Sequence, residues 1–131
     1  MVFSLMHETI LIADDDAEVR GILREALERA GYVTVEAANG NEALTALRTM
    51  QFDVLITDIA MPERDGPEMM EALRYERNSP KVIAMSGAWD GVCFPAATKL
   101  GAQALLPKPW KNRALLDTVR AVLDSYSTVP A

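Results

Sequence analysis

The sequence predicts one doubly wound α/β domain, in which a five-stranded parallel sheet is covered by helices on both faces. Short apolar runs alternate with longer amphipathic stretches five times along the chain, and the apolar runs contain few polar residues. Such alternation implies parallel strands joined by helical crossovers, and nearly continuous apolar strands are typical of a sheet buried on both faces. A length of 131 residues with 50% hydrophobic residues is enough for one core of this kind.

The five expected strands are short runs dominated by aliphatic residues. In chain order they lie at residues 10–13, 33–35, 54–57, 82–85 and 104–106. Each is separated from the next by a stretch long enough for a helical crossover. The runs therefore predict neighbouring strands of one sheet.

A first helix is predicted between the first two strands. Apolar residues from Val19 to Ala30 recur at helical spacing. Asp16 is placed to cap the start of this helix and Gly31 to end it.

The same spacing predicts further helices at residues 41–50, 66–76 and 111–124. Residues 94–100 are expected to form a less regular helix. Gly91 and Pro95 restrict where it can start, with Pro95 near its first turn.

The domain is expected to span residues 8–124, with 1–7 and 125–131 as short flexible tails. A formal net charge of −6 without a basic stripe argues against direct nucleic-acid binding, which needs clustered Lys and Arg. Cys93 is the sole cysteine, which excludes an internal disulfide, and neither a signal peptide nor a transmembrane run is expected. These features predict a cytoplasmic protein without membrane association.

Polar residues stand at or just beyond the carboxyl ends of four expected strands. They are Asp14 and Asp15 after the first strand, Asp58 after the third, Ser86 after the fourth and Lys108 after the fifth. In the flavodoxin-like strand order 2-1-3-4-5, strands one and three are neighbours where the order reverses, so the three carboxylates would converge. Like charges this close raise a pKa or recruit a cation, and oxygen ligands with room for water suit Mg²⁺. We therefore expect a Mg²⁺ site there.

A carboxylate, a hydroxyl and an ammonium beside Mg²⁺ suit phosphoryl transfer, because that reaction depends on positioning and on neutralising the phosphoryl oxygens. Asp58 would attack phosphorus in line as the nucleophile, and Ser86 and Lys108 would contact the phosphoryl oxygens. The expected product is an acyl phosphate on Asp58. Asp16 is left out of this set, because helix capping is the common role of Asp at such a position.

Four motifs, in their order and spacing, resemble the receiver domain of two-component response regulators across residues 8–124. They are Ile-Leu-Ile-Ala-Asp14-Asp15-Asp16, Asp58-Ile-Ala-Met61-Pro62-Glu-Arg-Asp65-Gly66, Ser86-Gly87-Ala88 and Lys108-Pro109. The resemblance implies a chemotaxis-regulator-like fold that acts as a phosphorylation switch. It further implies that Asp15 and Asp58 bind Mg²⁺ directly, that Ala60 adds its backbone carbonyl, and that Asp14 acts largely through bound water.

The fifth strand carries further expectations. The resemblance implies a cis peptide bond between Lys108 and Pro109. Pro107 removes a backbone donor, which is tolerated if this strand is the sheet edge. Leu105 stands where many receivers have Tyr or Phe, so the sequence gives no support to a switch that works through rotation of an aromatic ring.

As a receiver, the chain would take its phosphoryl group from a histidine kinase or a histidine phosphotransfer protein, because its sole histidine, His7, lies in the expected tail. It would catalyse only its own phosphorylation and dephosphorylation. Phosphorylation would switch the loop at 87–94, the fourth helix, the fifth strand and the last helix. This surface is expected to control association with a second copy of the chain or with an output partner.

Three other functions fit part of the pattern. A degenerate receiver that acts only as a protein-interaction module would not need the complete set of polar residues at the strand ends. A flavodoxin-like electron carrier would need a Ser/Thr-rich phosphate loop after the first strand, where Asp14 and Asp15 would repel the flavin phosphate. A Mg²⁺-dependent aspartyl phosphatase would typically have a second acid two residues beyond the nucleophile, where this chain has Ala60.

Overall fold

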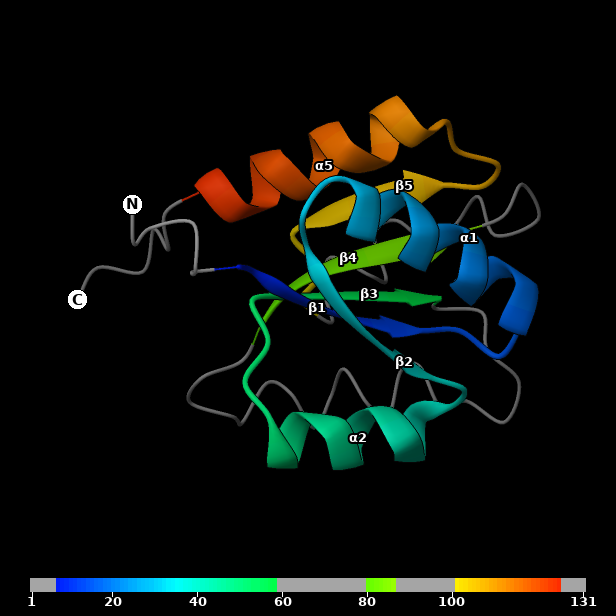
Figure 1. Cartoon of the computed structure of the whole chain (residues 1–131), viewed down its shortest axis with the longest axis vertical. Coiled ribbons are helices and arrows are strands. Elements are labelled where there is room, and N and C mark those ends of the chain that lie inside the picture. Colours follow the sequence, from blue (N-terminus) through cyan, green and yellow to red (C-terminus); the bar gives the residue numbers. More distant parts are fainter. Residues whose placement is uncertain (1–6, 59–79, 87–100, 126–131) are drawn as a thin grey trace.

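The computed structural model describes residues 7–58, 80–86 and 101–125, and forms a five-stranded parallel sheet with helices on both faces (Figure 1). The strand order is β2-β1-β3-β4-β5, which confirms the predicted order. The elements are β1 (Thr9–Ala13), α1 (Ala17–Arg29), β2 (Val33–Ala37), α2 (Gly40–Thr49), β3 (Val54–Asp58), β4 (Lys81–Ser86), β5 (Ala104–Pro107) and α5 (Asn112–Asp124). The helices predicted at 66–76 and 94–100, and most of the two predicted tails, lie outside the described residues.

The sheet separates two apolar layers. Among the described elements, α1 and α5 cover one face and α2 covers the other (Figure 1). In β1, Ile10 and Ile12 belong to the layer under α1 and α5, whereas Leu11 and Ala13 belong to the layer under α2. All four side chains are fully buried. Because successive side chains of a strand point to opposite faces, a strand covered on both sides must be apolar at every position.

α1 begins and ends as its sequence predicts. The side chain of Asp16 accepts hydrogen bonds from the amides of Glu18 and Val19, at 2.9 and 3.4 Å, and so satisfies two backbone donors that the helix cannot. The helix ends at Arg29 with Ala30 as its C-cap, and the following Gly31 has a φ of 99°. A glycine is favoured there because a side chain disfavours this left-handed backbone.

α2 begins one residue before its predicted start, because Asn39 supplies the cap. The Asn39 side chain accepts from the Glu42 amide at 2.9 Å, and the Glu42 carboxylate accepts from the Ala38 amide at 2.8 Å. These reciprocal bonds hold the entry to the helix and set its first residue at Gly40.

α5 packs Leu115, Val119 and Val122 into the layer that it shares with α1. The Lys81 ammonium, at the start of β4, donates to the carbonyl of Val122 at 3.0 Å and also to the carbonyl of Ser125. A cation at the carboxyl end of a helix satisfies carbonyls that lack an intrahelical partner. Within the part of the chain described, no helix combines the length and the apolar composition that a membrane span requires.

Candidate functional site

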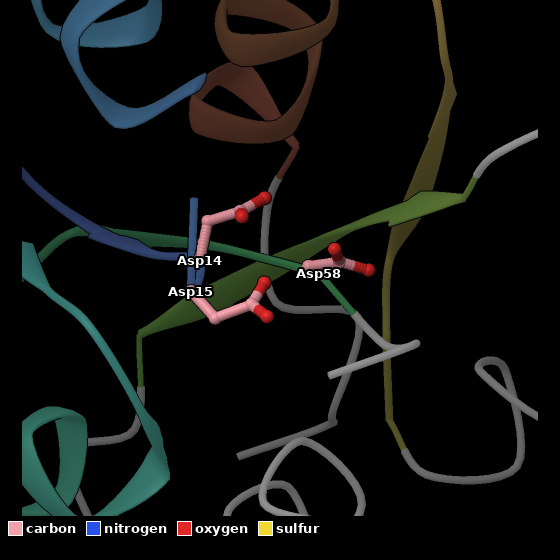
Figure 2. Close-up of side chains that lie close together, drawn as sticks. All are labelled: Asp14, Asp15 and Asp58. Carbon is pink, nitrogen blue, oxygen red and sulfur yellow. The ribbon is translucent and has the colours of Figure 1, made fainter. Parts of the chain in front are cut away.

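The carboxyl ends of β1 and β3 lie side by side at the centre of the sheet. Ala13, the last residue of β1, is paired in register with Thr57, so Asp14 leaves β1 beside Asp58, the last residue of β3. Figure 2 shows the side chains of Asp14, Asp15 and Asp58 close together at the ends of these strands. One oxygen from each of the three lies within 4.8 Å of the others. The predicted convergence of three carboxylates is therefore present.

The three carboxylates differ in exposure. Asp14 and Asp58 are buried, with 0% and 8% of their surface exposed, whereas Asp15 is exposed. The amide of Asp16 donates to Asp14 Oδ1 at 2.8 Å and holds that carboxylate in place. The cluster therefore has a buried side at Asp14 and an open side at Asp15.

Lys108 joins the two buried carboxylates. Its ammonium lies 2.9 Å from Asp58 Oδ2 and 3.3 Å from Asp14 Oδ2. Lys108 directly follows β5, an edge strand of the sheet, where the missing backbone donor of Pro107 is tolerated as predicted. The Lys108–Pro109 peptide bond is cis, as the resemblance implied.

Burial and charge act on the protonation of this cluster. Burial raises the pKa of Asp14 above its ordinary value of 3.8, because desolvation of the carboxylate outweighs the hydrogen bond from Asp16 and the charge of Lys108. Burial by itself would lower the pKa of Lys108, but the hydrogen bond and charge of Asp58, with those of Asp14, raise it above the ordinary 10.5. Lys108 therefore stays charged, whereas the ionised form of Asp14 is disfavoured by its burial.

The charges of this cluster suit a divalent cation. Three carboxylates and one ammonium leave two negative charges in excess among the described groups when all are ionised. Carboxylate oxygens are hard ligands, and the exposed position of Asp15 leaves room for water, which Mg²⁺ retains when it binds to proteins. The residues present therefore fit a Mg²⁺ ion.

Of two other predicted groups, Ser86 is described only in its backbone and Ala60 lies outside the described residues. The backbone of Ser86 ends β4 at the same edge of the sheet and is paired in register with Pro107. The structure does not describe the Ser86 side chain or any part of Ala60. Their predicted contacts with phosphate and metal therefore stay predictions.

Arg20 is a residue of this region that the sequence analysis missed. Its Nη1 donates to the backbone carbonyl of Asp14 at 2.7 Å. The sequence did contain one sign of its role. Arg20 lies about one turn into the predicted helix, where the positive end of the helix dipole disfavours a cation. Such a residue needs a nearby acceptor, and the turn that carries Asp14 supplies one.

The chain matches the family described as "Response regulator receiver domain" over residues 10–120, and it belongs to that family. Its curated relatives include the transcriptional regulatory protein CpxR of Escherichia coli (strain K12), at 35% identity over 114 residues, which are 87% of this chain and 48% of CpxR. The sensor kinase CckA of Brucella abortus (strain 2308) is 38% identical over 120 residues, covering 88% of this chain and 12% of that kinase. The chain thus spans about half of CpxR and a small part of CckA.

Solved structures agree with this assignment. The chemotaxis response regulator CheY4 of Vibrio cholerae superposes with a TM-score of 0.83 at 29% identity, covering 90% of this chain and all of that one. A putative response regulator from Chloroflexus aurantiacus J-10-fl superposes with a TM-score of 0.86 at 30% identity, covering 92% of this chain and all of its own. The family and fold predicted from the motifs are confirmed.

Receiver domains are signalling modules of two-component systems, and the chain is one of them. The alternative of a degenerate receiver is not supported, because the described site brings the acidic cluster and Lys108 together. The family match gives no support to an electron carrier or to a phosphatase.

Proposed function

We propose that this receiver domain accepts a phosphoryl group on Asp58 in a Mg²⁺-dependent reaction, and that phosphorylation changes which partners it binds. One observation carries the proposal: three carboxylates gather within 4.8 Å at the carboxyl ends of β1 and β3, with the Lys108 ammonium 2.9 Å from Asp58. Buried carboxylates beside an ammonium are costly for stability, and such costs are common at functional sites.

The proposed metal ligands are Asp14, Asp15, Asp58 and the backbone carbonyl of Ala60. Asp15 and Asp58 would bind directly, and Asp14 largely through water. Bound Mg²⁺ would neutralise charge on the phosphoryl oxygens and on the carboxylates around them. The excess negative charge of the described cluster supports a cation among the three carboxylates.

Asp58 is proposed as the nucleophile. A carboxylate oxygen of Asp58 would form the new O–P bond while the P–N bond of a donor phosphohistidine breaks, and the donor imidazole would leave. Lys108 is already bonded to Asp58 Oδ2, so its charge would stand beside the transferred group throughout the reaction. The hydroxyl of Ser86 is proposed to donate to a phosphoryl oxygen from the end of β4.

The proposed phosphoryl donor is a histidine kinase or a histidine phosphotransfer protein, met in the cytoplasm. One relative is named a sensor kinase and another a transcriptional regulatory protein, so sequences like this one occur in both kinds of protein. The proposed readout is binding of an output partner, or of a second copy of the chain, at the surface that includes β5 and α5.

Labelling with radioactive acetyl phosphate tests the proposal. The wild-type protein is expected to acquire label that depends on Mg²⁺ and is lost with EDTA, whereas Asp58→Asn should acquire none. Asp53→Asn is the matched control: it makes the same change just before β3, at the opposite end of that strand, where its side chain accepts from the Thr9 amide. Equal labelling of wild type and Asp58→Asn would overturn the assignment of the acceptor.

A further inference from the structure

Arg20 connects the first turn of α1 with the residues that precede that helix. Its guanidinium donates from Nη1 to the carbonyl of Asp14 at 2.7 Å and from Nε to Glu36 Oε1 at 3.0 Å. The Arg20 side chain is only 15% exposed. A guanidinium is planar and presents its donors in a fixed fork, so two such bonds hold both acceptors in one relative position.

The carbonyl of Asp14 lies where the pairing of β1 ends. Ala13 and Ala37 are the last pair of the β1–β2 register, and the Asp14 amide still donates to the Ala37 carbonyl at 3.1 Å. The Asp14 carbonyl instead accepts from the charged side chain of Arg20. A bond of this kind is roughly twice as strong as a neutral one, so it holds the main chain where it turns from β1 toward α1.

Glu36 anchors this arrangement to β2. Its Oε1 accepts from Arg20 and its Oε2 accepts from Arg24 at 3.1 Å. Arg24 is 53% exposed, and its guanidinium bonds Glu36 and not the turn before α1. The two arginines therefore share one partner, while only Arg20 also bonds the Asp14 backbone.

We propose that Arg20 is a positioning residue of the metal site: it holds the backbone of Asp14 and Asp15 in the geometry that Mg²⁺ binding requires, without contacting the ion. This inference rests on the proposed Mg²⁺-dependent function. Groups that orient metal ligands commonly change metal affinity by about ten- to a hundredfold when they are removed. Arg20 acts on two ligands at once, because Asp14 and Asp15 are consecutive.

The charge of Arg20 works against the same binding event. A cation near an acidic cluster repels Mg²⁺, so the loss of its charge alone would tighten metal binding. The loss of its bond to Asp14 would weaken binding, because the turn would then have to be ordered when the ion binds. Loss of the charge and loss of the bond therefore change the Mg²⁺ affinity in opposite directions when Arg20 is replaced.

Calorimetric Mg²⁺ titration of the whole chain distinguishes them. Arg20→Gln is expected to bind Mg²⁺ about tenfold more weakly than wild type. Arg24→Gln, the matched control, loses the same charge and a bond to the same Glu36, and is expected to bind as tightly as wild type or more tightly. Unchanged or tighter binding by Arg20→Gln would overturn the proposal, and so would equal weakening in both variants.

A second variant separates the effect on Mg²⁺ binding from a general loss of folding. Arg20→Lys keeps the charge and most of the packing, but an ammonium lacks the planar fork that serves both acceptors. It is expected to bind Mg²⁺ more weakly than wild type while it unfolds at a similar urea concentration. Wild-type affinity in Arg20→Lys would contradict a role that depends on the fork.

The labelling reaction separates positioning of the metal ligands from a purely structural role of Arg20. In Arg20→Gln the Mg²⁺ concentration for half-maximal labelling of Asp58 should rise about tenfold, while the rate at saturating Mg²⁺ approaches that of wild type. A lower rate at saturation with an unchanged Mg²⁺ requirement would count against positioning of the ligands. If the wild-type protein bound no Mg²⁺ at all, the proposed function would fail, and this inference with it.

Discussion

Asp14 is a buried carboxylate whose ionised form is disfavoured by its environment. Its carboxylate is fully buried, it faces Asp58, and its neutralising partner Lys108 is shared between the two. Burial raises the pKa of Asp14, so the ionised form is less favourable in the folded protein than in the unfolded chain. The free protein therefore carries this cost at neutral pH, and a bound cation would relieve it.

Replacement of this carboxylate tests that cost. Because the folded-state pKa of Asp14 is raised, the folded protein holds this proton more tightly than the unfolded chain. The contribution of protonated Asp14 to the wild-type stability is therefore lost as the pH rises from the unfolded-state pKa, near 3.8, through the folded-state pKa. Asp14→Asn has no such loss and keeps an oxygen for the Asp16 amide, so in metal-free buffer it should be more stable than wild type at neutral pH.

Urea unfolding over a series of pH values in EDTA measures this effect. The advantage of Asp14→Asn should shrink as the pH falls toward 3.8. Asp15→Asn is the control, because its exposed carboxylate is solvated by water and should matter less. A variant Asp14→Asn that is less stable than wild type at neutral pH would contradict the argument.

At the scale of elements, the strands extend beyond their apolar runs. β3 includes Asp58, which is paired with Met85, and β4 includes Ser86, which is paired with Pro107. Backbone pairing is indifferent to the polarity of the side chain, whereas an apolar run stops at the first polar residue. The predicted strands were therefore short at their ends, and the residues left out include Asp58 and Ser86, both of which belong to the proposed site.

α1 contains a glycine that its geometry does not require. A Cβ added to Gly21 would meet nothing within 4 Å. Gly21→Ala should therefore raise the free energy of unfolding by about 1 kcal/mol, because alanine restricts the unfolded chain and favours helix. Urea unfolding at neutral pH measures the difference.

Gly31 provides the matched control for this substitution. A Cβ there would also meet nothing within 4 Å, but the backbone has a φ of 99°. Gly31→Ala should lower the free energy of unfolding by roughly 1–2 kcal/mol, because an L-residue is strained in this conformation. A change of the same sign in both variants would show that backbone conformation does not decide the outcome.

At the scale of the whole molecule, the site exists only in the folded state. The acidic cluster combines residues 14 and 15 with residue 58, and Lys108 joins it from β5. The unfolded chain does not hold these groups together. A ligand that needs all of them therefore binds the folded state and stabilises it by mass action.

Mg²⁺ should accordingly raise the stability of the wild-type protein. At about a hundred times its dissociation constant the gain should be about 2.7 kcal/mol, and EDTA should remove it. Asp15→Asn replaces an exposed side chain by one of the same size but removes a proposed direct ligand. The stability of this variant should therefore respond less to Mg²⁺ in the same urea experiment. An identical response from the two proteins would contradict the role of Asp15.

The sequence alone predicts the class of fold and most element positions, together with the cap at Asp16, the turn at Gly31 and the three carboxylates that meet at the strand ends. These features depend on local backbone preferences, on the period of apolar residues and on the rule that parallel strands end at one edge. They can therefore be deduced from neighbours along the chain.

Three features could not be predicted from the sequence: Asp14 is buried while Asp15 is exposed, Lys108 bonds two carboxylates, and Arg20 reaches the Asp14 carbonyl. Each of these depends on how elements distant in sequence pack together, and the contacts of Lys108 and Arg20 depend also on the reach of a long side chain. Burial and ion pairing are properties of the assembled neighbourhood, and no local pattern in the chain encodes their geometry.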